Sequence, residues 1–131
     1  MLMHEKKRKR ALKKGCLRQA SYRHRQRSKQ LDQLQLRITR KSHKKAVELR
    51  KKTGWLMGEI YLKAIEAADL NNLPAMHQPS FTEEDIGVRS ICPWATAEIF
   101  AKFDKISNNY RSTVNAMSAI LYNYCCKALN E

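Results

Sequence analysis

The first fifty-two residues of this 131-residue chain contain very little negative charge. They hold three acids, Glu5, Asp32 and Glu48, against twenty of the chain's twenty-six lysines and arginines, so this segment has a net charge of +17. Residues 53–131 hold six cations and nine acids, which gives a net charge of −3. Ordinary solvated surfaces mix both signs, so a segment this one-sided predicts a polyanionic partner.

Glycine and proline are also scarce, with four and three residues, and aromatic residues make up only 8% of the chain. Strand-like alternation is limited, and the residues that favour helices (Ala, Leu, Lys, Arg, Gln and Glu) dominate. This composition predicts an all-α fold. We expect a basic helical arm over residues 1–52, with a disordered extreme N-terminus, and a compact bundle of three or four helices over residues 53–131.

No stretch approaches the roughly 18 consecutive apolar residues that a membrane-spanning helix needs. The charged N-terminus also lacks the apolar segment of a secretory signal. The four cysteines (Cys16, Cys92, Cys125 and Cys126) are therefore expected to be reduced thiols. The expected location is the cytoplasm, or the nucleus if the source is eukaryotic or viral.

The motifs of catalysis and of metal binding are missing as well. The cysteines show no C-x2-C spacing, and the four histidines (His4, His24, His43 and His77) are scattered along the chain. There is no glycine-rich phosphate loop, no nucleophile elbow and no H-E-x-x-H motif. We therefore expect no enzymatic activity, no metal, no cofactor and no small-molecule substrate.

A long amphipathic pattern runs from about residue 17 to Gly54, without an intervening proline or glycine. On a helical wheel, Leu31, Leu34 and Ile38 fall on one side. This apolar seam precedes the expected bundle, so it needs a surface to cover it. Three are open: the same domain folded back, a second copy of the chain, or a different protein.

The opposite side of the same wheel is basic. Arg37, Arg40, Lys41 and Lys44 are spaced i, i+3, i+4 and i+7, which would place a continuous cationic stripe on a helix. Lysine and arginine neutralise the phosphates of nucleic acids, and arginine also makes bidentate contacts. The expected nucleic-acid-binding residues are Lys6, Lys7, Arg8, Lys9, Arg10, Lys13, Lys14, Arg18, Arg23, Arg25, Arg27, Lys29, Arg37, Arg40, Lys41, Lys44 and Lys51.

Two classes of function fit this pattern. The first is a non-enzymatic nucleic-acid-binding accessory protein that contacts the backbone of DNA or RNA. The alternative is a structural or inhibitory module whose basic arm clamps an acidic protein, with Leu31, Leu34 and Ile38 as the interface, or which forms a homo-oligomer. Membrane-surface binding is disfavoured because bulky apolar residues are nearly absent from residues 1–30. Small basic helical proteins are common among phage and plasmid accessory proteins and ribosome-associated proteins, an analogy that assigns no residue a role.

The second half of the chain predicts its own helices. A strongly apolar stretch from Trp55 to about Leu70 predicts one, and residues 82–85 have the pattern of a capping box that opens a short helix. Further helices are expected from about residue 93 to 106 and from about residue 110 to 128. The pair before residue 106 could form a helix-turn-helix, although core packing explains it better. The Gly54-x3-Gly58 spacing either permits close helix packing or is accidental.

Overall fold

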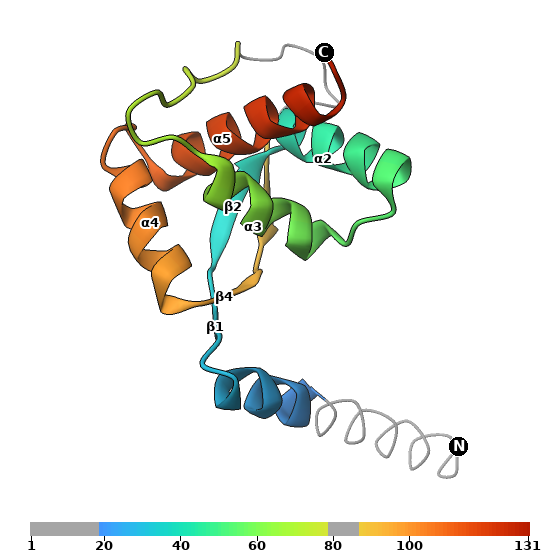
Figure 1. Ribbon diagram of the computed structural model, residues 1–131, viewed down its shortest axis with the longest axis vertical. Coiled ribbons are helices and arrows are strands. Elements are labelled where there is room, and N and C mark those ends of the chain that lie inside the picture. The colour runs from blue at the N-terminus through green and yellow to red at the C-terminus, as the bar shows by residue number, and fades with distance from the viewer. Residues whose placement is uncertain (1–18, 79–86) are drawn as a thin grey trace, which may run out of the picture. The chain divides into compact units, whose positions relative to one another are not determined.

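The computed structural model describes residues 19–78 and 87–131 and divides the chain into two units, residues 1–32 and 33–131 (Figure 1). In the first unit, residues 19–28 are helical. The helix ends where Gln30 takes a left-handed conformation (φ 63°) and the Leu31 amide donates to the Gln26 carbonyl at 3.1 Å. This is a common way to satisfy the last carbonyls of a helix.

The second unit contains strands as well as helices, so the expectation of a purely α-helical fold is wrong. Strand β2 (Leu36–Thr39) pairs antiparallel with β3 (Val88–Ile91), in a register that sets Leu36 opposite Ile91. A second two-stranded sheet consists of β1 (Asp32–Gln33) and β4 (Trp94–Ala95). The fold is mostly helical, with these two small sheets.

The single helix expected from residue 17 to residue 52 is interrupted at residues 29–39. The reason is a periodicity of two that overlaps the helical one. Leu34, Leu36 and Ile38 are all buried, and the residues between them are exposed. Leu34 and Ile38 fit both a helix and a strand, whereas Leu36 faces the core only if the segment is extended.

Helix α2 (Arg40–Thr53) begins and ends at residues suited to those positions. Thr39 is its N-cap, and the Thr39 hydroxyl accepts a hydrogen bond from the Ser42 amide at 3.3 Å. Gly54 ends the helix in a left-handed conformation (φ 77°), and its amide donates to the Arg50 carbonyl at 2.8 Å. The sequence allowed either a break at Thr53-Gly54 or a helix that continued through it, and the structure has the break.

The three later helices follow the expected segments but begin two to four residues later than expected. They are α3 (Met57–Ala67), α4 (Ala97–Ser107) and α5 (Thr113–Ala128). Thr96 and Ser112 cap α4 and α5 by accepting from the amides three residues later. The capping box over residues 82–85 lies outside the described residues. Because residues 88–91 form a strand, the helix-turn-helix fails, and α4 instead buries Ile99, Phe103 and Ile106.

Helix α5 is the centre of the second unit. It packs against α2, α3, α4 and β2, which lie below it and to its right in Figure 1. Its own Met117, Ile120, Leu121 and Cys125 are buried almost completely. It also supplies a buried polar contact to β2, because Ser118 Oγ accepts a 2.9 Å hydrogen bond from the Thr39 amide. A buried amide without a partner would be costly, so this bond helps fix where β2 ends and α2 begins.

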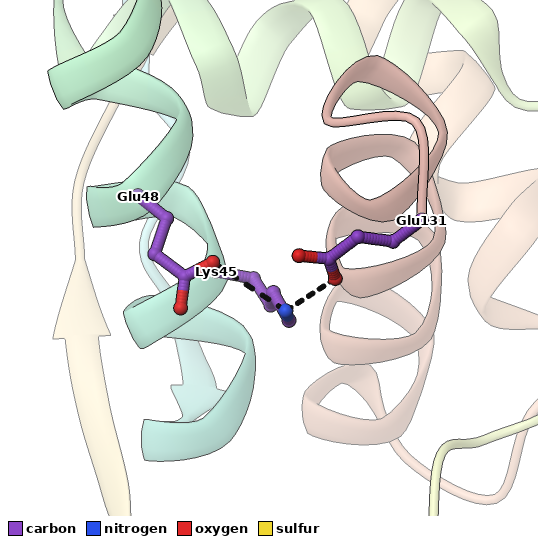
Figure 2. A network of polar contacts seen from close by, with 3 residues as sticks. All are labelled: Lys45, Glu48 and Glu131. Atoms are coloured by element: carbon purple, nitrogen blue, oxygen red, sulfur yellow. Dashed lines mark hydrogen bonds and ion pairs between the residues drawn. The ribbon is translucent and has the colours of Figure 1, made fainter.

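A polar network joins α2 to the chain that follows α5. The Lys45 ammonium group contacts the carboxylates of both Glu48 and Glu131, as Figure 2 shows. The hydrogen bond from Lys45 to Glu131 is the main reason that the pKa of Lys45 is raised. The two carboxylates are about half exposed, with side-chain exposures of 53% and 47%. The network therefore contributes little to the free energy of folding, and its main effect is to hold Glu131 beside α2.

Candidate nucleic-acid interface

The helix over residues 19–28 presents cations to solvent. Arg23, Arg25 and Arg27 are exposed, as is Lys29 directly after the helix. None of them forms an ion pair with a carboxylate among the described residues. Four unpaired cations within seven residues create a local positive field that a polyanion can neutralise.

The stripe expected at residues 37–44 is divided by the change in backbone. Arg37 lies on strand β2, while Arg40 begins helix α2, and both side chains are exposed. Lys44 and Lys51 lie further along α2 and are also exposed. A single helical stripe with the spacing i, i+3, i+4, i+7 is therefore wrong, because a strand places residue 37 by a periodicity of two.

Lys41 differs from its neighbours because it has contacts within the fold. Its ammonium group donates to the Gln78 carbonyl at 3.2 Å and lies 5.5 Å from the centre of the Tyr122 ring. These contacts hold the loop after α3 against α2 and α5. Lys41 is only half exposed and is the least available cation of the expected set among the described residues.

The three residues of the expected apolar seam have different environments. Leu34 and Ile38 belong to the core of the second unit, with 6% and 0% of their surface exposed. Leu31 is half-buried in the first unit. Of the three coverings considered for the seam, the same domain folded back is the one observed for Leu34 and Ile38. They are not accessible to a separate partner while this unit is folded.

Eight expected residues (Lys6, Lys7, Arg8, Lys9, Arg10, Lys13, Lys14 and Arg18) lie outside the described part of the chain.

The structure also forms an open cavity that the sequence did not indicate. It has a volume of about 470 Å³ and lies between α2, the start of α3 and strand β3. Helix α2 contributes His43, Val47 and Arg50, and β3 contributes Arg89. The remaining lining residues are Met57, Gly58, Tyr61, Ser90, Ile91, Cys92 and Pro93. The i, i+4, i+7 spacing of His43, Val47 and Arg50 is visible in the sequence, but the position of Arg89 beside them is set by strand pairing.

The two arginines dominate the electrostatics of this cavity. Burial lowers the pKa of His43, and the positive charges of Arg89 and Arg50 lower it further. Burial raises the pKa of Tyr61, and the same two arginines oppose that rise. Both guanidinium groups therefore act on both side chains. No acidic residue lines the cavity among the residues described.

A second cavity of about 480 Å³ borders β2 and β3, and Arg37 is the only cation among its described lining residues. Within residues 19–78 and 87–131, no three His, Cys, Asp or Glu side chains gather as metal ligands. Over the same ranges, no helix combines the length and the apolar character required to cross a bilayer.

No protein-family model matches the chain, and neither a curated protein nor a solved structure matches it at a significant level.

Proposed function

We propose that the protein is a non-enzymatic nucleic-acid-binding accessory protein, whose N-terminal half contacts the phosphate backbone. The observation that carries this proposal is a set of exposed cations that form no ion pair with another described residue, namely Arg23, Arg25, Arg27, Lys29, Arg37 and Arg40. A protein surface that served only solubility would pair or intersperse such charges. Backbone phosphates are the ligands that an array of unpaired lysines and arginines suits best.

The distribution of these cations favours backbone contact over base recognition. They lie on a helix, a strand and the start of a second helix, and they are not gathered on one recognition helix. Helix α4 offers no alternative, because its first turn holds the acid Glu98 and no cation. We therefore expect binding that tolerates many sequences and depends steeply on salt.

Fluorescence anisotropy of the full chain with duplex DNA, single-stranded DNA and structured RNA tests the proposal. Each ligand is titrated across a salt series. We compare the triple variant R23A/R25A/R27A with the matched control K105A/R111A/K127A, which removes three exposed cations outside the basic segment. The first variant should lower the slope of log affinity against log salt by about 0.9 for each phosphate contact removed.

The control variant should retain most of the affinity and the original salt slope. Equal losses in the two variants would mean that overall charge alone attracts the ligand, and would contradict a contact surface in the N-terminal half. Binding that is weak, equal for all three ligands and absent at physiological salt would contradict nucleic-acid binding altogether.

A further inference from the structure

The cavity between α2, α3 and β3 has the chemistry of an anion site. Arg50 and Arg89 reach it from elements that lie far apart in the sequence. Neither guanidinium group has an ion pair or a hydrogen bond with any residue the structure describes. Two unpaired guanidinium groups on one cavity can bind the oxygens of a phosphate through paired hydrogen bonds.

Tyr61 provides an independent indication of a ligand. It lines the cavity and is only 6% exposed, yet its hydroxyl group has no hydrogen-bond partner among the described residues. Buried hydroxyl groups are normally bonded, and one that is not carries a desolvation cost. A tyrosine hydroxyl carries its proton at neutral pH, and burial raises the pKa of Tyr61 further, so the hydroxyl can donate to an anionic oxygen.

The start of α3 adds further donors. Met57 and Gly58 are its first two residues and line the cavity, and the N-cap residue Leu56 makes no side-chain hydrogen bond to this turn. The free amides of a helix N-terminus favour an anion. A Cβ placed on Gly58 would meet nothing within 4 Å, so the wall of the cavity is open at this position.

We propose that this cavity binds the phosphoryl group of a phosphate monoester, either the terminal phosphate of a nucleic-acid strand or that of a free nucleotide. Arg50 and Arg89 neutralise its charge, and Tyr61 donates to one of its oxygens. The volume of about 470 Å³ exceeds that of a phosphate, and Val47, Met57 and Ile91 form an apolar wall for the adjoining part of the ester. Binding of a phosphate monoester in this cavity is separate from backbone binding by the N-terminal half. Either proposal can hold if the other fails.

Calorimetric titration of the full chain with inorganic phosphate and with adenosine monophosphate tests the site. The double variant R50A/R89A should weaken binding by about a hundredfold or more, because both charge-assisted contacts are lost. The matched control K51A/K52A removes two exposed cations from the same helix but leaves the cavity intact, and should bind almost normally. Equal losses in the two variants would overturn the proposal.

Two further variants separate binding from folding. Tyr61→Phe removes a buried hydroxyl group that has no partner among the described residues, so it should keep or raise the midpoint of thermal unfolding while weakening adenosine monophosphate binding about tenfold. Gly58→Leu places a good helix former in open space at the cavity wall, and should block binding without lowering stability. Unchanged affinity in both variants would contradict the assigned site.

Anisotropy with oligonucleotides that carry a 5′-phosphate or a 5′-hydroxyl group distinguishes the two sources. A preference for the 5′-phosphate that Tyr61→Phe abolishes would assign the site to a strand end, whereas binding of adenosine monophosphate without that preference would assign it to a nucleotide. If the protein neither prefers the 5′-phosphate nor binds adenosine monophosphate, the inference is overturned. The variant R23A/R25A/R27A should affect only backbone binding, so failure of one proposal can be told from failure of the other.

Discussion

The side-chain oxygen of Thr39 lies 2.9 Å from Nε2 of His77, which links the start of α2 to the loop that follows α3. His77 Nδ1 lies 3.2 Å from the Gln78 carbonyl, which can only accept, so Nδ1 carries the proton. Nε2 therefore accepts from the Thr39 hydroxyl in the neutral ring. The ring also packs on Tyr122, with 4.9 Å between the ring centres. The Thr39 hydroxyl can donate to Nε2 only while His77 is unprotonated, so protonation reverses the direction of this bond.

The stability of the second unit should consequently fall in mild acid. Burial lowers the pKa of His77 from its usual 6.5; the bond to Gln78 opposes this shift, and the charge of Lys41 adds to it. The unfolded chain thus binds the proton more tightly, so stability is fully present above about pH 6.5 and is lost as the pH falls through the folded pKa. Urea unfolding of His77→Gln across this range should show a weaker dependence on pH than the unaltered protein.

His43 also has a lowered pKa, so the variant His77→Gln should retain part of the acid dependence. The exposed His24 in the first unit provides the matched control, and His24→Gln should leave the profile unchanged. An identical pH profile for His77→Gln and the unaltered protein would contradict the link between His77 and Thr39.

Ile38 should behave as a core residue. It is fully buried, with 0% exposure, so Ile38→Ala removes packed methyl groups and leaves a cavity. We expect the free energy of unfolding to fall by about 2–5 kcal/mol. Leu56, with 69% exposure, is the control, and Leu56→Ala should change it by less than about 0.5 kcal/mol. Chemical denaturation measures the free energy of unfolding of both variants. A similar loss of free energy in the two would contradict the packing of β2.

The two glycines of the G-x3-G pattern should respond in opposite directions. Gly54 has a φ of +77°, so Gly54→Ala forces a strained conformation and should destabilise the protein by about 1 kcal/mol. Gly58 is the second residue of α3, and no atom lies within 4 Å of an added Cβ, so Gly58→Ala should stabilise the protein by up to about 0.5 kcal/mol. Thermal unfolding measures both. Destabilisation by both would instead indicate the close helix packing that the spacing allows.

The cysteines of the described residues should differ in reactivity. Burial raises the pKa of Cys125 to about 12, whereas Cys92 is exposed. Because the thiolate is the reactive form, iodoacetamide at pH 8 should label Cys92 in the folded protein and label Cys125 only after unfolding. Peptide mapping by mass spectrometry gives the extent of labelling at each position. Rapid labelling of Cys125 in the folded protein would show that α5 is not packed as described.

Several features of the fold follow from local chemistry and were predictable. Gly54 has no side chain and readily takes a left-handed conformation, so the end of α2 could be placed from the sequence. The helical pattern from about residue 110 to 128 likewise predicts α5. For α4 and α5 the starts differed, because the capping residues Thr96 and Ser112 begin each helix later than the apolar pattern suggests.

The candidate phosphate site could not be predicted in the same way. Arg50 belongs to a segment whose many cations look alike in sequence, and Arg89 belongs to a segment with little charge pattern. Their convergence depends on β2 pairing with β3, which sets Ile38 opposite Arg89. No property of either arginine's neighbours in the sequence reports that pairing.

The sequence by itself determined the charge asymmetry, the mostly helical character and the positions of α3, α4 and α5, because each depends on residues within a few turns of one another. The tertiary structure decided the state of residues 32–39 and the site beside Arg50. Leu34 and Ile38 satisfy a helical and an extended pattern equally well in isolation. The extended form prevails because it buries Leu36 as well and pairs its backbone with a strand about fifty residues away.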